Sequence, residues 1–192
     1  MQQAIQFILE IDKLKAVTRK VKPLGLDRYE NSAEHSWQLT LLAYSLAPYA
    51  PAPVNMDHVI RMLLVHDIGE IDTGDTMVFV EGGWAERKQD ELAAVTRIFN
   101  LLPPEQASEL LALWKEFEAG ETAESRFANA IDRAMPGLLN LHNNGQSWKE
   151  NNISYDRVVG RIRAQIEDGC PALWQYMQPK LLAAREAGFF GA

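Results

Sequence analysis

The chain has 192 residues, and 47% of them are hydrophobic, which is typical of one globular domain with a sizeable core. Its formal net charge of −7 argues against a nucleic-acid polymer or an anionic membrane as the main partner, because both favour basic proteins. The single cysteine, Cys170, excludes a disulfide within the chain and favours a reducing compartment. Since the N-terminus also lacks a signal-peptide pattern, the sequence predicts a cytoplasmic protein.

Apolar residues with helical spacing recur along nearly the whole chain. The first predicted helix covers about residues 4–17, and a loop over about residues 20–31 follows it. Ser32 suits the N-cap of a second helix, which ends before Pro51 and Pro53. This part of the sequence therefore predicts two helices joined by a long loop.

The middle of the chain predicts two further helices. Asp57 suits the N-cap of the first, which carries the adjacent residues His66 and Asp67. Residues 71–83 contain three glycines and have an irregular pattern. A second helix is predicted for about residues 84–101, so the irregular segment connects the two.

The remaining sequence predicts four more helices. Residues 103–104 are both proline and suit the first turn of one helix, and Thr122 suits the N-cap of the next. A polar loop is predicted for residues 143–152, and helices for about residues 155–167 and 171–187. No segment alternates as a strand does, so we expect an all-α single-domain helical bundle over the whole chain.

An imidazole and a carboxylate are adjacent within an apolar stretch, at His66 and Asp67. Burying both is costly unless something binds them, and a divalent metal is the natural candidate. Glu70 follows one turn later and shares their helix face. His35, in the first turn of its predicted helix, and Asp132, in a largely apolar helix, are two more candidate ligands. The candidate site thus lies within about residues 30–140, and the last two helices, over about residues 153–188, follow it.

Two imidazoles and two carboxylates form a mixed nitrogen and oxygen ligand set. Such a set suits one divalent ion of manganese, cobalt, magnesium, nickel, iron or zinc better than it suits copper(I). An alternative stays open from the residues alone, because His66 could cap a helix end or pair with Asp67 at the surface. Spacing does not choose between these two interpretations.

The order of these residues resembles the HD-domain metal-dependent phosphohydrolases. Thirty residues separate His35 from His66 and Asp67, and a further 64 precede Asp132. The surrounding segments are similar to the 5′-deoxynucleotidase branch of that family: ENSAEHS at residues 30–36, HDIGEIDTGD at residues 66–75, LKAVTR at residues 14–19 and AESRF at residues 123–127. The similarity extends over about residues 8–140.

The resemblance implies a helical bundle of the HD-domain type that hydrolyses phosphoric monoesters with one bound divalent metal. The implied metal ligands are His35, His66, Asp67 and Asp132. The implied substrate is a small phosphorylated molecule, most of all a nucleoside 5′-monophosphate, and neither a nucleic-acid polymer nor a membrane is an expected partner. Members of this type commonly form homodimers.

The resemblance also implies catalytic and substrate-binding residues. Glu70 would position or deprotonate the attacking water, and Arg19 would bind the substrate phosphate through its forked guanidinium. Asp75 would contact the sugar or position the nucleophile. Carboxylates near a cation usually stay ionised, so the base is the easier role for Glu70 or Asp75. The backbone at Thr76, Met77 and Val78 would line the nucleotide pocket.

One departure concerns the sugar. In the deoxynucleotidases a tryptophan that helps to exclude the ribose 2′-hydroxyl follows the phosphate-binding arginine, whereas Lys20 follows Arg19 here. Alternative functions are therefore an HD hydrolase of another phosphorylated small molecule or nucleotide, and a non-catalytic dimer that binds metal and nucleotide. A purely structural metal would give Glu70 and Arg19 little purpose.

Overall fold

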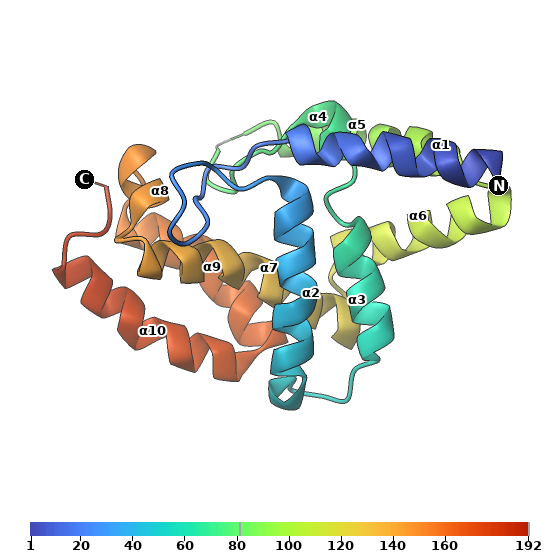
Figure 1. The fold of residues 1–192 in the computed structure, drawn as a ribbon. Helices are drawn as coiled ribbons and strands as arrows, with labels where there is room; N and C mark the ends of the chain where they lie inside the picture. The colour runs from blue at the N-terminus through green and yellow to red at the C-terminus, as the bar shows by residue number, and fades with distance from the viewer. Residues whose placement is uncertain (81, 192) are drawn as a thin grey trace.

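The computed structural model describes residues 1–80 and 82–191, and this part of the chain contains helices, turns and loops but no β-strand (Figure 1). The prediction of an all-α fold is confirmed. The α-helices span Gln2–Ile11 (α1), Ser32–Leu46 (α2), Met56–Val65 (α3), Glu70–Thr73 (α4), Trp84–Phe99 (α5), Pro104–Ala119 (α6), Ala123–His142 (α7), Gln146–Glu150 (α8), Tyr155–Gly169 (α9) and Pro171–Glu186 (α10). Short 3₁₀ helices cover Asp12–Ala16 (η1) and Ala47–Tyr49 (η2).

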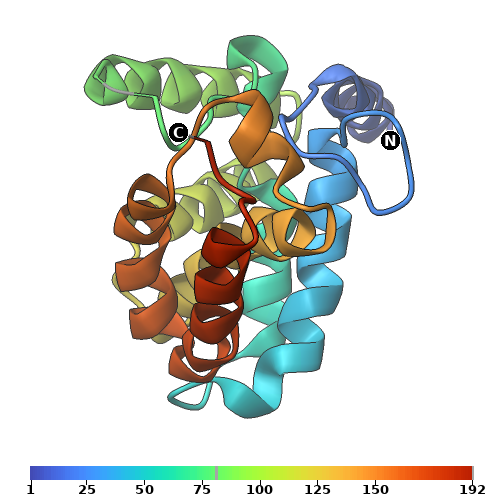
Figure 2. The same ribbon diagram turned by 90° about the vertical axis from the view of Figure 1, so that its left-hand side faces the viewer.

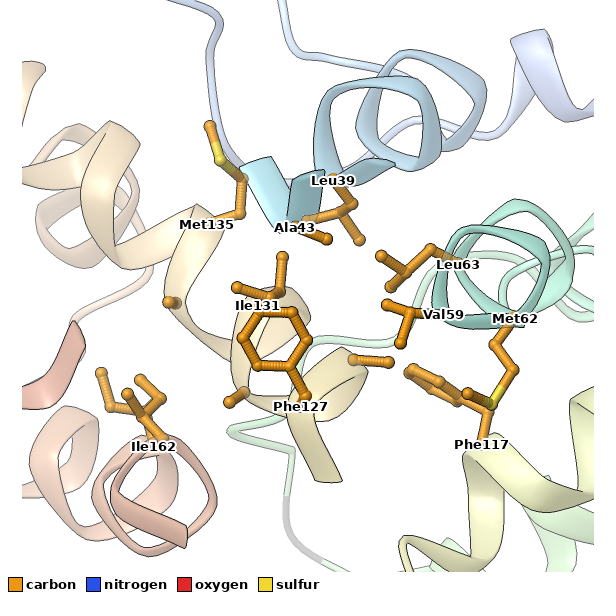
Figure 3. Close-up of a cluster of buried hydrophobic side chains, with 14 of the residues drawn as sticks. Leu39, Ala43, Val59, Met62, Leu63, Phe117, Phe127, Ile131, Met135 and Ile162 are labelled. Carbon is orange, nitrogen blue, oxygen red and sulfur yellow. The ribbon is translucent and has the colours of Figure 1, made fainter. Parts of the chain in front are cut away.

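Helix α7 is the centre of the bundle. It contacts α2, α3, α6, α9 and α10, and more than half of its 20 residues are buried. Figure 3 shows Phe127 and Ile131 of α7 facing Leu39 of α2 and Val59 and Leu63 of α3. Because α7 has neighbours on several sides, a polar side chain on its buried face, such as that of Asp132, lies inside the protein.

Two groups of helices complete the bundle. Helices α9 and α10 lie side by side against α7 (Figure 2). Helices α1, α4 and α5 lie together at one end of the bundle, the upper end in Figure 1. In the described residues, no helix combines the length and the apolar character needed to cross a membrane.

Two predicted N-caps are wrong by one or two positions. The cap of α2 is Asn31 and not Ser32, because the Asn31 side chain accepts the backbone N–H of Glu34 at 2.9 Å. The cap of α3 is Asn55 and not Asp57, since Asn55 accepts the N–H of His58. The prediction for Thr122 is correct, and its side chain caps α7.

Several predicted boundaries also differ. The first predicted helix divides into α1 and η1, and the predicted irregular and polar loops contain α4 and α8. The largest difference is at α3, which ends at Val65, so that Asp67 lies in the turn before α4. The indole N–H of Trp114 in α6 donates to the carbonyl oxygen of His66 at 3.1 Å. In a continuing helix, this carbonyl oxygen would instead accept the backbone N–H four residues later.

The contact between α7 and α9 depends on a glycine at the end of α9. A Cβ at Gly169 would lie 2.0 Å from the carbonyl oxygen of Arg126 and 2.8 Å from the Cβ of Ala130. Both are on α7, and the first is a backbone atom that cannot turn aside. Gly160, in the middle of the same helix, is exposed and has no atom within 4 Å of its Cβ position.

We therefore expect Gly169→Ala to lower the free energy of unfolding by about 1–3 kcal/mol, the usual cost of overpacking. Gly160→Ala is the matched control and should stabilise by about 0.5–1 kcal/mol, because alanine is the better residue inside an exposed helix. Urea denaturation of both variants measures the two changes. Equal stability of the variants would contradict this account of the α7–α9 contact.

Candidate metal centre

Three distant parts of the chain bring two imidazoles and a carboxylate to one point. His35 lies in the first turn of α2, His66 is the C-cap of α3, and Asp132 is in the middle of α7. Asp132 Oδ1 lies 3.0 Å from His35 Nε2 and 3.7 Å from His66 Nε2. All three residues are buried, and one potential ligand atom from each lies within 4.8 Å of the others. The group has the size and chemistry of a metal site.

Asp67, the fourth predicted ligand, lies beside this group. Its Oδ1 is 3.1 Å from His66 Nε2, and its Oδ2 is 4.0 Å from His35 Nε2. Asp67 lies in the turn between α3 and α4 and not on the helix face that the sequence predicted, and this turn directs its carboxyl group toward the two histidines. The structure therefore brings all four sequence-predicted ligands together, although Asp67 and His66 are not in one helix.

The hydrogen bonds of His66 fit a bound cation. His66 Nδ1 lies 2.8 Å from the carbonyl oxygen of Leu63, which can only accept, so Nδ1 carries a proton. His66 Nε2 is buried and has no hydrogen-bond partner among the residues described. In its neutral form, which metal binding requires, the ring would present its Nε2 lone pair toward Asp132 Oδ1, 3.7 Å away. An orphaned ring nitrogen beside two carboxylates is what a divalent ion requires.

The charges of the site stabilise one another. Burial alone would lower the pKa of His66, but the charge of Asp67 and the interaction with Asp132 outweigh it and raise this pKa well above its ordinary value. Burial opposes ionisation of Asp132 as well, yet His35 and His66 hold its pKa well below the usual range. For Asp67, burial is outweighed by His66 and Arg19, and the pKa falls to about 2. Ionised carboxylates are the form that binds a metal.

Arg19 lies next to the candidate ligands, as expected for a group that binds a substrate anion. Its Nη1 donates to Asp67 Oδ2 at 3.0 Å and lies 3.6 Å from Asp75 Oδ1 and 3.9 Å from Glu70 Oε1. These carboxylates raise the pKa of Arg19, against the effect of its burial. Glu70 in turn accepts the hydroxyl of Ser32 at 2.6 Å.

Glu70 and Asp75 differ from the ionised carboxylates that the sequence predicted. Burial, and then the charge of Asp67, raise the pKa of Glu70 to about 9. Burial also raises the pKa of Asp75, with Arg19 opposing it. Among the protein's own charges alone, Glu70 therefore holds a proton at neutral pH. A nearby cation would favour its ionised form.

A cavity of about 270 Å³ connects these groups with an apolar region. Its polar end includes Arg19, Lys20, Asp67, Glu70, Asp75 and Asp132, and residues 76–78 are also among its lining residues. Its other wall includes Phe79, Trp84, Trp148, Val158 and Ile162, from α5, α8, α9 and the loop before α5. Sequence reasoning missed this wall and also Glu91, since isolated tryptophans and a surface-like glutamate have no motif around them.

The comparisons with known proteins agree with this geometry. A family model described as "HD domain" matches residues 11–174. A crystal structure from Magnetospirillum magnetotacticum, described as a predicted metal-dependent phosphohydrolase, is 40% identical, with a TM-score of 0.93 over 99% of this chain and 95% of that chain.

Two curated relatives are more distant. The human protein named 5′-deoxynucleotidase HDDC2 is 28% identical over 176 residues, which are 84% of this chain and 85% of the human protein. A 5′-deoxynucleotidase from Pasteurella multocida is 28% identical over 153 residues, or 74% of this chain and 78% of that protein. Because the family model covers most of its length and the Magnetospirillum protein is similar throughout, the chain belongs to the HD domain family.

Proposed function

We propose that this protein is a metal-dependent phosphohydrolase that releases phosphate from nucleoside 5′-monophosphates, with the deoxy forms as its main substrates. The observation that carries the proposal is the position of Arg19, whose guanidinium lies 3.0 Å from a candidate metal ligand in the same cavity. A cation and an arginine side by side are suited to a phosphate group. The names of the curated relatives support the same reaction.

The shape of the cavity supports a nucleotide. Its charged end fits a phosphate, and its apolar end, which includes Phe79, Trp84 and Trp148, fits a flat base. The small volume of about 270 Å³ favours one small molecule over a polymer. In a nucleoside monophosphate, the phosphate matches the charged end of the cavity and the base matches its apolar end.

His35, His66, Asp67 and Asp132 would hold one divalent ion through nitrogen and oxygen atoms. Manganese, cobalt, magnesium, nickel, iron and zinc all accept such a ligand set. When bound, such an ion lowers the pKa of a coordinated water and polarises a phosphoryl oxygen.

The surrounding residues perform the remaining steps. Arg19 binds the phosphate oxygens and holds the phosphorus in line with the attacking water. Glu70 accepts the proton of that water, a role that requires its ionised form and therefore a nearby cation. Asp75, whose Oδ1 lies 3.6 Å from Nη1 of Arg19, contacts the sugar or positions the nucleophile.

A second copy of the chain is the proposed partner. Trp37, Leu41 and Tyr44 are each at least half exposed and follow one another along one face of α2, where they would be covered in a homodimer. Analytical ultracentrifugation measures the oligomeric state directly.

The cytoplasmic location also stays a prediction.

Phosphate release from a panel of ribo- and deoxyribonucleoside mono-, di- and triphosphates tests the proposed function. The protein is stripped of metal and then given manganese, cobalt or magnesium. We expect release from deoxynucleoside monophosphates only, and only with metal. Release from both sugars would assign the lost selectivity to Lys20. No release from any monophosphate, with metal bound, would contradict the proposal.

Replacing Glu70 with Gln should leave metal binding intact and lower kcat by about 100-fold or more, because a positioned base contributes about 10²–10⁴-fold. Asp72→Asn is the matched control. Asp72 is in the same short helix, but it pairs with Arg97 outside the cavity at 2.7 Å, so its loss should leave kcat unchanged. Steady-state kinetics with titrated manganese compare the two. Near-normal turnover by Glu70→Gln would remove this residue from the mechanism.

Glu91, in the cavity wall, makes the stability of the folded protein depend on pH. Its backbone oxygen would lie 3.2 Å from a Cβ at Gly69, so α5 packs tightly against the turn after Asp67. Burial, and then the charges of Glu118 and Asp67, raise the pKa of Glu91 from 4.5 to about 7. The folded protein therefore binds this proton more strongly than the unfolded chain does.

The stability that Glu91 contributes is fully present below about pH 4.5 and is lost as the pH rises through about 7. Glu91→Gln keeps a neutral side chain at every pH. Relative to the original protein, the variant should therefore gain melting temperature between about pH 5 and pH 8, and thermal unfolding of both proteins without metal measures the change. A difference that stays constant over that range would show that Glu91 does not ionise there.

A further inference from the structure

A second buried carboxylate stands behind the candidate metal centre. Glu30 is only 1% exposed, although it belongs to the long loop before α2. Glutamate is almost never buried to this extent unless it is paired, because removing its charge from water is costly. Glu30 does not line the cavity, so it has no contact with a substrate there. Its burial needs another explanation.

Backbone pairing places Glu30 beside Arg19. The N–H of Arg19 donates to the carbonyl oxygen of Glu30 at 3.0 Å, and the N–H of Glu30 donates to that of Val21 at 2.9 Å. An isolated antiparallel bridge between Thr18 and Asn31 belongs to the same pairing. The two loop ends thus hold each other in register, and the side chains of Arg19 and Glu30 meet inside the protein.

The Glu30 side chain lies between two functional groups. Its Oε1 is 3.3 Å from Arg19 Nε and 3.4 Å from His35 Nδ1. These three atoms are buried, and none has a hydrogen-bond partner in the part of the chain that is described. Leaving three such atoms unpaired is costly, and Oε1 of Glu30 lies within 3.4 Å of both nitrogen atoms, so one carboxylate oxygen can accept from both.

Hydrogen bonds from His35 Nδ1 and Arg19 Nε to Glu30 would direct the other nitrogen atoms of both side chains toward the candidate metal centre. With a proton on Nδ1 for Glu30, His35 keeps Nε2 free on the side where Asp132 lies at 3.0 Å. With Nε facing Glu30, Arg19 turns its Nη1 toward Asp67 and Asp75. A carboxylate behind a metal-binding histidine fixes the tautomer and strengthens the ligand. Here the same carboxylate also faces the guanidinium group.

We propose that Glu30 is a positioning residue that orients His35 for the metal and Arg19 for the phosphate at the same time. Glu30 would contact neither the metal nor the phosphate, and it would couple the residue that binds the one to the residue that binds the other. This inference rests on the proposed function, because it needs His35 to bind metal and Arg19 to bind phosphate.

The test compares Glu30→Gln with Glu34→Gln. Glu34 is one turn further along, pairs with the exposed Arg28 and closes the capping box of α2, which glutamine also can do. Manganese binding to metal-free protein is measured by calorimetry, and KM with the best nucleoside monophosphate. Glu30→Gln should bind manganese about 10-fold or more weakly and raise KM, as expected when the partner of a ligand is changed. Glu34→Gln should match the original protein in both, and Glu30→Asp should recover part of the loss.

Thermal unfolding of each metal-free variant shows whether the fold is affected. If Glu30→Gln lowers only the melting temperature and keeps manganese affinity and KM, Glu30 is structural and the proposal is wrong. If the original protein binds no manganese and releases no phosphate, the proposed function fails, and the role of Glu30 fails with it. The original protein with bound zinc gives an independent reading by nitrogen NMR. A His35 proton on Nδ1 would support the proposal, and a proton on Nε2 would overturn it.

Discussion

The structure depends on an excess of negative charge that is buried at one place. The carboxyl groups of Asp67, Glu70, Asp75 and Asp132 converge there, and Arg19 is a permanent cation among them, with Arg133 Nε 4.0 Å from Asp132 Oδ2. Burial raises the pKa of Glu70 to about 9 and that of Asp75 above its ordinary value, so protons neutralise part of this excess charge. A divalent cation would remove the rest. The same carboxyl groups can therefore be neutralised by protons when no metal is bound and by a metal when one is.

Helix α7 makes this concentration of charge possible. Its apolar residues, such as Phe127 and Ile131, hold α2 and α3 against it, and Asp132 follows on the same buried helix. The end of α3 is fixed from another direction, because Trp114 of α6 binds the carbonyl oxygen of His66. The site is thus assembled by hydrophobic packing, and the charged residues need only point inward from helices that are already in place.

The sequence predicts which candidate ligands converge better than it predicts the local structure around them. His66 and Asp132 could be recognised because ligating residues in apolar helical stretches are unusual, whereas His35 lies in a polar first turn and is identified by its segment's resemblance to the family. The end of α3 could not be predicted, since it depends on a tryptophan 48 residues away. Adjacent residues Asn31 and Ser32 are both good N-caps, and only tertiary contacts distinguish them, because Ser32 uses its hydroxyl for Glu70.

Glu30 illustrates the same limit from the other side. In the sequence it is one acidic residue in a polar loop, and only the pairing of residues 18–21 with residues 30–31 buries it. The candidate metal ligands come from α2, the end of α3, α7 and the turn after α3, whereas the apolar wall of the cavity comes largely from α5, α8 and α9. Changes in that wall, or at Lys20, can alter the preferred base or sugar without moving a ligand. A carboxylate that connects Arg19 to His35 is then the means by which phosphate binding stays aligned with the metal while the remainder of the pocket varies.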